Sequence, residues 1–147
     1  MAWQSYAEAQ QRATGVRTTG QLLFSALATR FLMVNPEGVI PTMPPTSAFS
    51  GDAISFTMTS DGSSIVVSAS KSNAPDVVTE VLLQPLESVH RRTYPRKYRT
   101  AAVHAFVEGE PLALPAPGRV TAVAVRLIRA STGQAGDLME VGVVLGG

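Results

Sequence analysis

Residues 120–144, VTAVAVRLIRASTGQAGDLMEVGVV, contain the pattern that decides the fold. The apolar and β-branched residues of 119–130 predict a long strand, with Val123, Val125 and Leu127 on one face. The opposite face is also largely apolar, with Val120, Ala122, Ala124 and Ile128. A strand that is apolar on both faces is expected at the centre of a sheet, buried from two sides. Ser131-Thr132-Gly133-Gln134 predicts a turn, and 138–145 predicts the last strand.

The chain upstream of this hairpin has the same two-residue period from Asp52 onward. Ile54, Phe56 and Met58 alternate with polar residues, and Asp61-Gly62 is a strong signal for a hairpin turn. Further strands are expected over 64–69, 77–84 and 98–107. The strand over 98–107 is expected to place Tyr98, Ala102 and Phe106 on one face, whereas the proline-rich stretch 111–118 is expected to be a loop.

The N-terminal third is helical in pattern. A short helix is expected over 2–13, with Trp3, Tyr6, Ala7 and Gln10 on one side. Thr18 and Gln21 have the spacing of a capping box before LLFSALATRFLMV, and Asn35-Pro36 ends this second helix. Because apolar residues occur nearly all round the second helix, we expect it to be buried, on a sheet or between subunits.

Residues 35–51 hold four prolines and form a stiff connector, because proline fixes the backbone angle φ. The chain therefore divides into a helical arm with its connector over 1–51 and a β-sandwich domain over 52–147. The predicted fold is mainly β: an antiparallel, immunoglobulin-like β-sandwich preceded by one or two helices. A small α+β fold is the alternative.

Composition limits the possible functions. Charged residues make up 16% of the 147 residues, whereas globular chains carry about 25%, which favours assembly into a larger structure. A net charge of +1 does not indicate a general nucleic-acid binder. The chain has no cysteine, which excludes disulfides and thiolate catalysis, and its two histidines make a zinc site improbable. We expect no cofactor and no metal.

From Asp52 to about residue 146 the expected strands resemble those of fibronectin type III and immunoglobulin-like sandwiches. The closing hairpin is similar to the paired last strands of such modules. The segment VLLQPLESVHRRTYPRKYR, residues 81–99, resembles the middle of modules in small bacterial and phage proteins. The chain lacks the disulfide and the core tryptophan of true immunoglobulin domains, since Trp3 lies outside the sandwich. The resemblance implies a recognition or structural unit of cell surfaces or virus particles, although fold alone does not give function.

The densest concentration of charge is His90–Arg99, which we call the basic segment. Arginine pairs with phosphate or carboxylate through two hydrogen bonds, and tyrosine stacks on rings. The residues expected to bind a partner are Arg91, Arg92, Tyr94, Arg96, Lys97, Tyr98 and Arg99. The alternatives are a solvated edge whose charge prevents aggregation, or a subunit interface.

Other polar residues give weaker signals. His104 or His90 could act as a general base, but the sequence favours a half-buried structural histidine at His104, because no serine or carboxylate motif accompanies it. Glu108 and Glu110 flank Gly109 and are expected at a solvated hairpin end. No nucleophile elbow and no phosphate-binding glycine loop occurs in the sequence.

The sequence thus favours a non-enzymatic assembly protein, such as a capsid decoration or connector subunit of a phage particle. The residues expected to form its assembly arm are Trp3, Tyr6, Leu23, Phe24, Leu27 and Phe31. The arm could also pack on its own chain. The expected partners are further copies or other virion subunits, with nucleic acid less favoured and no membrane. A monomeric module that binds a glycan or protein through its loops is the alternative, and an enzyme using His104 or His90 is a third hypothesis.

The stretch MAWQSYAEAQQRA lacks the basic start and apolar core of a secretory signal, and the longest apolar stretch, 22–34, is shorter than the roughly 20 residues of a membrane span. Synthesis in the cytoplasm is therefore expected, with location in the virion if the assembly hypothesis holds.

Overall fold

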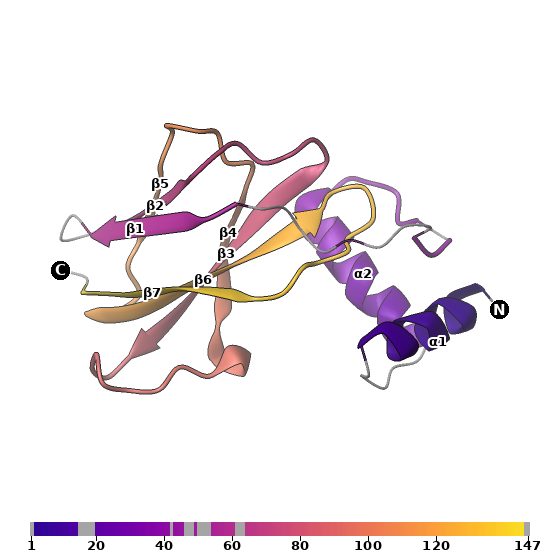
Figure 1. The fold of residues 1–147 in the computed structure, drawn as a ribbon, viewed down its shortest axis with the longest axis horizontal. Coiled ribbons are helices and arrows are strands. Elements are labelled where there is room, and N and C mark those ends of the chain that lie inside the picture. Colours follow the sequence, from indigo (N-terminus) through magenta and orange to yellow (C-terminus); the bar gives the residue numbers. More distant parts are fainter. Residues whose placement is uncertain are drawn as a thin grey trace. The chain divides into compact units, whose positions relative to one another are not determined.

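The computed structural model describes residues 2–14, 20–41, 43–45, 49, 54–60 and 64–145. The chain forms two compact units (Figure 1). One comprises Met1–Phe49 together with Arg129–Gln134, and the other comprises Ser50–Ile128 together with Ala135–Gly147. We call them the helical unit and the sandwich unit.

The sandwich unit has two sheets whose paired strands run antiparallel (Figure 1). One sheet has the order β1-β2-β5, with strands Phe56–Ser60, Ser64–Ala69 and Leu112–Pro115. The other has the order β4-β3-β6-β7, with strands Arg99–His104, Val77–Leu86, Val120–Arg129 and Met139–Leu145. The prediction of an antiparallel β-sandwich preceded by helices is confirmed.

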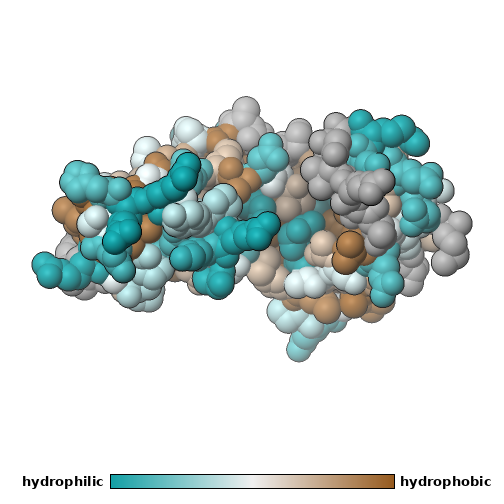
Figure 2. Space-filling view, turned by 90° about the horizontal axis from the view of Figure 1, so that it is seen from below, coloured by the Kyte–Doolittle hydropathy of each residue, from teal (hydrophilic) through white to brown (hydrophobic). Residues whose placement is uncertain are grey.

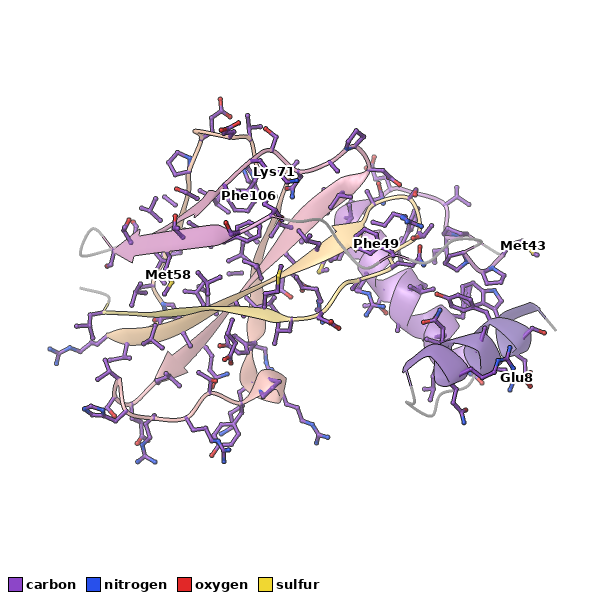
Figure 3. All side chains as sticks on the ribbon, in the orientation of Figure 1. Glu8, Met43, Phe49, Met58, Lys71 and Phe106 are labelled. Atoms are coloured by element: carbon purple, nitrogen blue, oxygen red, sulfur yellow. The ribbon has the colours of Figure 1, made fainter. Side chains whose placement is uncertain are left out.

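The core between the sheets is made by the strand residues that alternate inward. Phe106, which follows β4, is one of its fully buried members (Figure 3). Its ring meets that of Phe56 edge to face at 5.4 Å. The buried members of this core are Ile65, Val67, Val81, Leu83, Phe106, Leu114, Val123, Val125 and Val144. The central strand β6 is buried on both faces, as its sequence predicts.

The hairpin of β1 and β2 also follows the prediction, with Phe56 opposite Ala69 and Ser60 opposite Ile65. The Asp61-Gly62 turn signal itself lies outside the described residues.

Two strand predictions were wrong. The stretch 111–118 was expected to be a loop, but Leu112–Pro115 forms β5 and pairs with β2. Its one proline, Pro115, is tolerated because β5 is an edge strand, where a missing backbone donor leaves no ladder bond unmade. The prediction that Tyr98 shares one face with Ala102 and Phe106 was also wrong for Tyr98.

Tyr98 lies just before β4 and packs on the outer face of the four-stranded sheet, with Leu82, Ala122 and Ala124. Phe106 and Ala102 belong instead to the core between the sheets. The register between β3 and β4 shifts between Val81 and Leu82, which breaks the simple two-residue alternation across this stretch.

The helical unit consists of α1, Ala2–Thr14, and α2, Gly20–Val34, with the connector and the segment Arg129–Gln134. Trp3, Tyr6, Ala7 and Gln10 are the more buried side chains of α1, as its periodicity predicts. Thr18, the expected N-cap, lies outside the described residues. The amide of Asn35 donates to the carbonyls of Phe31 (3.2 Å) and Ala130 (2.8 Å), which fixes the end of α2.

Within one chain α2 is buried on one side only, so the burial between subunits that its sequence also predicts stays a prediction. Leu27 and Phe31 are buried, but Leu22 and Leu32 on other sides of the helix are exposed to solvent. The periodicity could not separate these faces because apolar residues occupy both. No helix among the described residues has the length and apolar character needed to cross a membrane.

Candidate binding site on the basic segment

The basic segment connects β3 to β4 and contains one short 3₁₀ turn, Pro95–Lys97. Figure 2, seen from below Figure 1, shows hydrophilic side chains gathered over this end of the sandwich unit. Arg91, Arg92, Tyr94, Arg96, Lys97 and Arg99 are all exposed. Of the predicted binding residues, Tyr98 differs, because its side chain is only 5% exposed. Tyr98 therefore supports the segment from beneath and does not face a partner.

Gln84 in β3 holds the backbone of the basic segment in place. Its Nε2 donates to the carbonyl of Tyr94 at 2.7 Å, and its Oε1 accepts from the Tyr94 N–H at 3.1 Å. Gln84 is buried, so these bonds satisfy an amide that would otherwise lose its water without replacement. Sequence reasoning missed this residue. The available signal was a single glutamine inside the otherwise apolar run VLLQPL.

Glu140 in β7 forms a second anchor. Its Oε1 accepts hydrogen bonds from the Thr93 hydroxyl at 2.6 Å and from the Tyr98 hydroxyl at 3.3 Å. Burial, followed by the negative charge of Glu140, raises the pKa of Tyr98 to about 12. The phenol is therefore neutral at ordinary pH and remains a hydrogen-bond donor to the carboxylate.

The cations of the segment have few internal partners. Arg91 pairs with Glu87 at 2.8 Å, with both side chains largely exposed, and Lys97 lies 5.2 Å from the centre of the Tyr94 ring. Arg99 donates to the carbonyls of Arg96 and Tyr98. Among the residues that the structure describes, Arg92 has no ion pair. The segment therefore presents positive charge that the protein itself does not neutralise.

These side chains surround a cavity of about 220 Å³. Arg91, Arg92 and Lys97 supply its positive charge, and Glu87 supplies one negative charge. Tyr94 and the end of β3 at Pro85 complete the wall. The cavity is smaller than the roughly 300–1,000 Å³ of drug-sized ligand sites, so it fits a small charged group and not a large cofactor.

The remaining polar candidates do not converge. The His104 ring packs edge to face on Phe106 at 4.9 Å, whereas His90 is exposed in the basic segment. Glu108 and Glu110 are exposed in a turn around Gly109, whose φ is +83°. Within the described part of the chain, no group of three or more histidine, aspartate or glutamate side chains has the geometry of a metal site.

The residues expected to form an assembly arm make up the interior of the helical unit. The Trp3 ring meets the Tyr6 ring at 5.7 Å and the Phe24 ring at 5.2 Å, both edge to face. Leu27 and Phe31 are buried and Leu23 is half-buried. Burial raises the pKa of Tyr6, opposed by its hydrogen bond with Gln134 and by nearby arginines.

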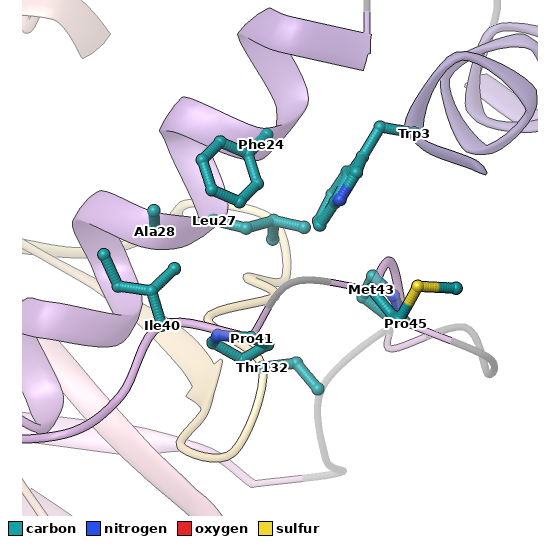
Figure 4. A pocket seen from close by; sticks show the side chains of 9 residues that line it. All are labelled: Trp3, Phe24, Leu27, Ala28, Ile40, Pro41, Met43, Pro45 and Thr132. Atoms are coloured by element: carbon teal, nitrogen blue, oxygen red, sulfur yellow. The ribbon is translucent and has the colours of Figure 1, made fainter. Parts of the chain in front are cut away.

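Beside Trp3, Phe24 and Leu27 lies a crevice of about 20 Å³, closed on its other side by the connector (Figure 4). This volume has room for about one water molecule, and the walls are mostly apolar, so the crevice is a packing defect and not a ligand site. The apolar side chains that the helical unit leaves exposed are different ones: Leu22, Leu32, Val39 and Met43. Sequence reasoning did not single out these positions.

No protein-family model matches the chain, and no curated protein matches it either. The solved structures that are similar include the β-glucosidase 3B of Thermotoga neapolitana in complex with glucose, at 17% identity and a TM-score of 0.27. The same enzyme in complex with glycerol matches at 14% identity and a TM-score of 0.26. Both matches cover 78% of this chain, which spans 19% of the enzyme's length.

Proposed function

We propose that the chain is a non-enzymatic assembly subunit, of the kind that virus particles use as decoration or connector proteins, and that the helical unit binds a second copy. The observation that carries this proposal is the exposure of four large apolar side chains among residues 22–43 of the helical unit. Leu22, Val39 and Met43 are 63%, 89% and 66% exposed, and Leu32 accompanies them.

Water disfavours such a set of side chains. Burying one Leu, Val or Met is worth about 1.5–3 kcal/mol. A second copy of the same chain carries the same apolar set, and twofold pairing of identical surfaces is the commonest form of oligomer. The low proportion of charged residues supports the same conclusion, since few charges need be desolvated when copies associate.

The sandwich unit supports the proposal in a different way. Its two sheets, of three and four strands, enclose a filled core. Two-sheet sandwiches of this general kind include the fibronectin type III modules that the sequence resembles. We propose membership of that class of sandwich on this basis. Such modules act as rigid platforms, with their binding functions in loops and attached segments.

The proposal is tested by light scattering on a sizing column over a range of concentrations. We expect a fixed oligomer, and we expect the double variant Leu22→Lys/Val39→Lys to be a monomer near 15.5 kDa. The control is Val107→Lys, at an exposed valine of the sandwich unit, which should leave the oligomer intact. A wild-type monomer at all concentrations would overturn assembly through a second copy.

A second candidate function is favoured by the cavity of the basic segment. In that case the chain is a monomeric recognition module, and the sandwich unit presents the cavity to an acidic partner. The same experiment separates the two, because this module would remain a monomer and the lysine variants would not change its mass.

A further inference from the structure

We propose that the open cavity lined by Glu87, Arg91, Arg92, Tyr94 and Lys97 is an anion site that binds a doubly charged phosphate monoester. This inference is independent of the assembly proposal, because it concerns a ligand of the sandwich unit and holds whether or not copies associate.

The charge of the cavity sets the charge of its ligand. Three cationic side chains and one carboxylate line the wall, so the lining has an excess of two positive charges. A phosphate monoester carries about −1.5 to −2 at pH 7, which matches that excess, and it offers three acceptor oxygens. A carboxylate, a phosphate diester or a sulfate monoester carries only one negative charge.

The donors of the cavity suit the same group. A guanidinium forms two parallel hydrogen bonds with a phosphate, and an ammonium adds a compact point charge. Arg92 is available for this role, since it forms no ion pair within the described residues. Arg91 is held only by its exposed pair with Glu87, and exposed pairs of this kind are weak enough for an incoming anion to replace.

The backbone beneath these donors is fixed before any ligand arrives. Gln84 holds the N–H and carbonyl of Tyr94, and Glu140 holds Thr93. A site whose backbone is already in place loses less conformational entropy on binding. The volume of about 220 Å³ admits a phosphate with the first atoms of the group that carries it.

The first experiment measures binding of methyl phosphate and methyl sulfate to the full chain by NMR titration at pH 7.5 and pH 5. At pH 7.5 we expect methyl phosphate to bind about tenfold more tightly than methyl sulfate, because the second charge of the phosphate adds roughly one further Coulomb interaction at this exposed site. At pH 5 the phosphate has lost that charge, and the advantage should disappear. Any change in the charge of the protein between the two pH values acts on both ligands alike, so the ratio of the two affinities isolates the phosphate. Equal affinities at pH 7.5 would overturn the proposal.

Variants locate the site. Arg92→Gln and Lys97→Gln should each weaken methyl phosphate binding about tenfold, and Lys97→Arg should retain it. The matched control is Arg96→Gln, which removes the same charge from the same segment at a residue outside the cavity wall. Its effect should stay below about threefold. If Arg96→Gln weakens binding as much as Arg92→Gln, the field of the whole segment binds the anion and the cavity does not.

The source of the monoester is distinguished by three further ligands: a phosphoserine peptide, glucose 6-phosphate, and an oligonucleotide without terminal phosphates. Tighter binding of the peptide or of the sugar phosphate than of methyl phosphate supports the proposal and identifies the carrier. Tighter binding of the oligonucleotide, whose phosphates are all diesters, would overturn it in favour of nucleic acid.

Discussion

Gly133 provides the most direct test of how the helical unit is held together. Its φ is +81°, and a Cβ at this position would lie 2.2 Å from the carbonyl oxygen of Leu27 and 2.9 Å from the backbone nitrogen of Phe31. The neighbours are backbone atoms of α2, so no side-chain rotation can relieve the clash. The Gly133 carbonyl also accepts a hydrogen bond from Nε of Arg30 at 2.8 Å.

We expect Gly133→Ala to separate the segment Arg129–Gln134 from α2. The left-handed backbone costs an alanine about 1 kcal/mol, and the overpacking adds about 1–3 kcal/mol, for a total of roughly 3 kcal/mol. A helix of 15 residues is marginally stable by itself in water, so α2 should lose protection when this contact is lost. Roughly 3 kcal/mol corresponds to an increase in amide exchange on the order of 100-fold.

The assay is hydrogen exchange by mass spectrometry, with the amides of α2 compared with those of β6 as an internal reference. The matched control is Gly109→Ala. Gly109 has nearly the same φ, +83°, but a Cβ there would meet nothing within 4 Å. Gly109→Ala should therefore lose only the roughly 1 kcal/mol of stability that a left-handed backbone costs an alanine, with faster exchange confined to its own hairpin. If both variants exchange alike in α2, the close approach of Gly133 does not stabilise the helical unit.

Three further predictions concern the sandwich unit. Gln84→Leu should lower the free energy of unfolding by about 2 kcal/mol, because it leaves the N–H and carbonyl of Tyr94 unpaired; urea denaturation measures this. Buried Glu80 in β3 forms an ion pair with Arg126 in β6, with 2.5 Å between Oε1 and Nη2. Glu80→Gln should lower the free energy of unfolding by about 2 kcal/mol in the same assay, less than for a fully buried pair, since Arg126 remains 28% exposed. Replacing both, as Glu80→Leu/Arg126→Met, should recover part of that loss. Tyr98 should ionise near pH 12 in an ultraviolet titration, and a transition near pH 10 would contradict this. Because folding raises its pKa from 10, the contribution of Tyr98 to stability is complete below pH 10 and is lost as the pH rises through 12.

The strands were predictable wherever a local pattern determines them. The β1–β2 hairpin and the doubly buried β6 follow from side-chain alternation alone, which depends on neighbours a few residues apart. The strand β5 was not predictable in this way, because Pro115 within it and Pro111 and Pro117 beside it indicate a loop, and only its pairing with β2 makes it a strand. The face of Tyr98 depends on a register shift in another strand, which no local pattern records.

The candidate site was predictable in part for the same reason. The exposed arginines and Lys97 are adjacent in sequence, so their concentration is visible without a structure. Their supports are not adjacent. Glu140 lies 47 residues from Thr93, and Gln84 belongs to a strand that reads as core. The exposed apolar residues of the helical unit were missed because the pattern of α2 does not distinguish its buried from its exposed apolar positions.

The anchoring of the basic segment bears on the simplest alternative, a solvated edge that prevents aggregation. Charge alone prevents aggregation, since lysines and arginines on an edge strand repel the edge of another molecule whatever the conformation of the backbone that carries them. Here, instead, two buried residues on the outer face of the four-stranded sheet hold the basic segment: Gln84 binds the backbone of Tyr94, and Tyr98 packs on the sheet. Burying an amide and a phenol carries a desolvation cost that two good hydrogen bonds only offset. A fixed backbone has no value for repulsion, but it lowers the entropy lost when a ligand is bound. The fixed backbone is therefore an argument for the proposed anion site and against a segment that only protects an edge.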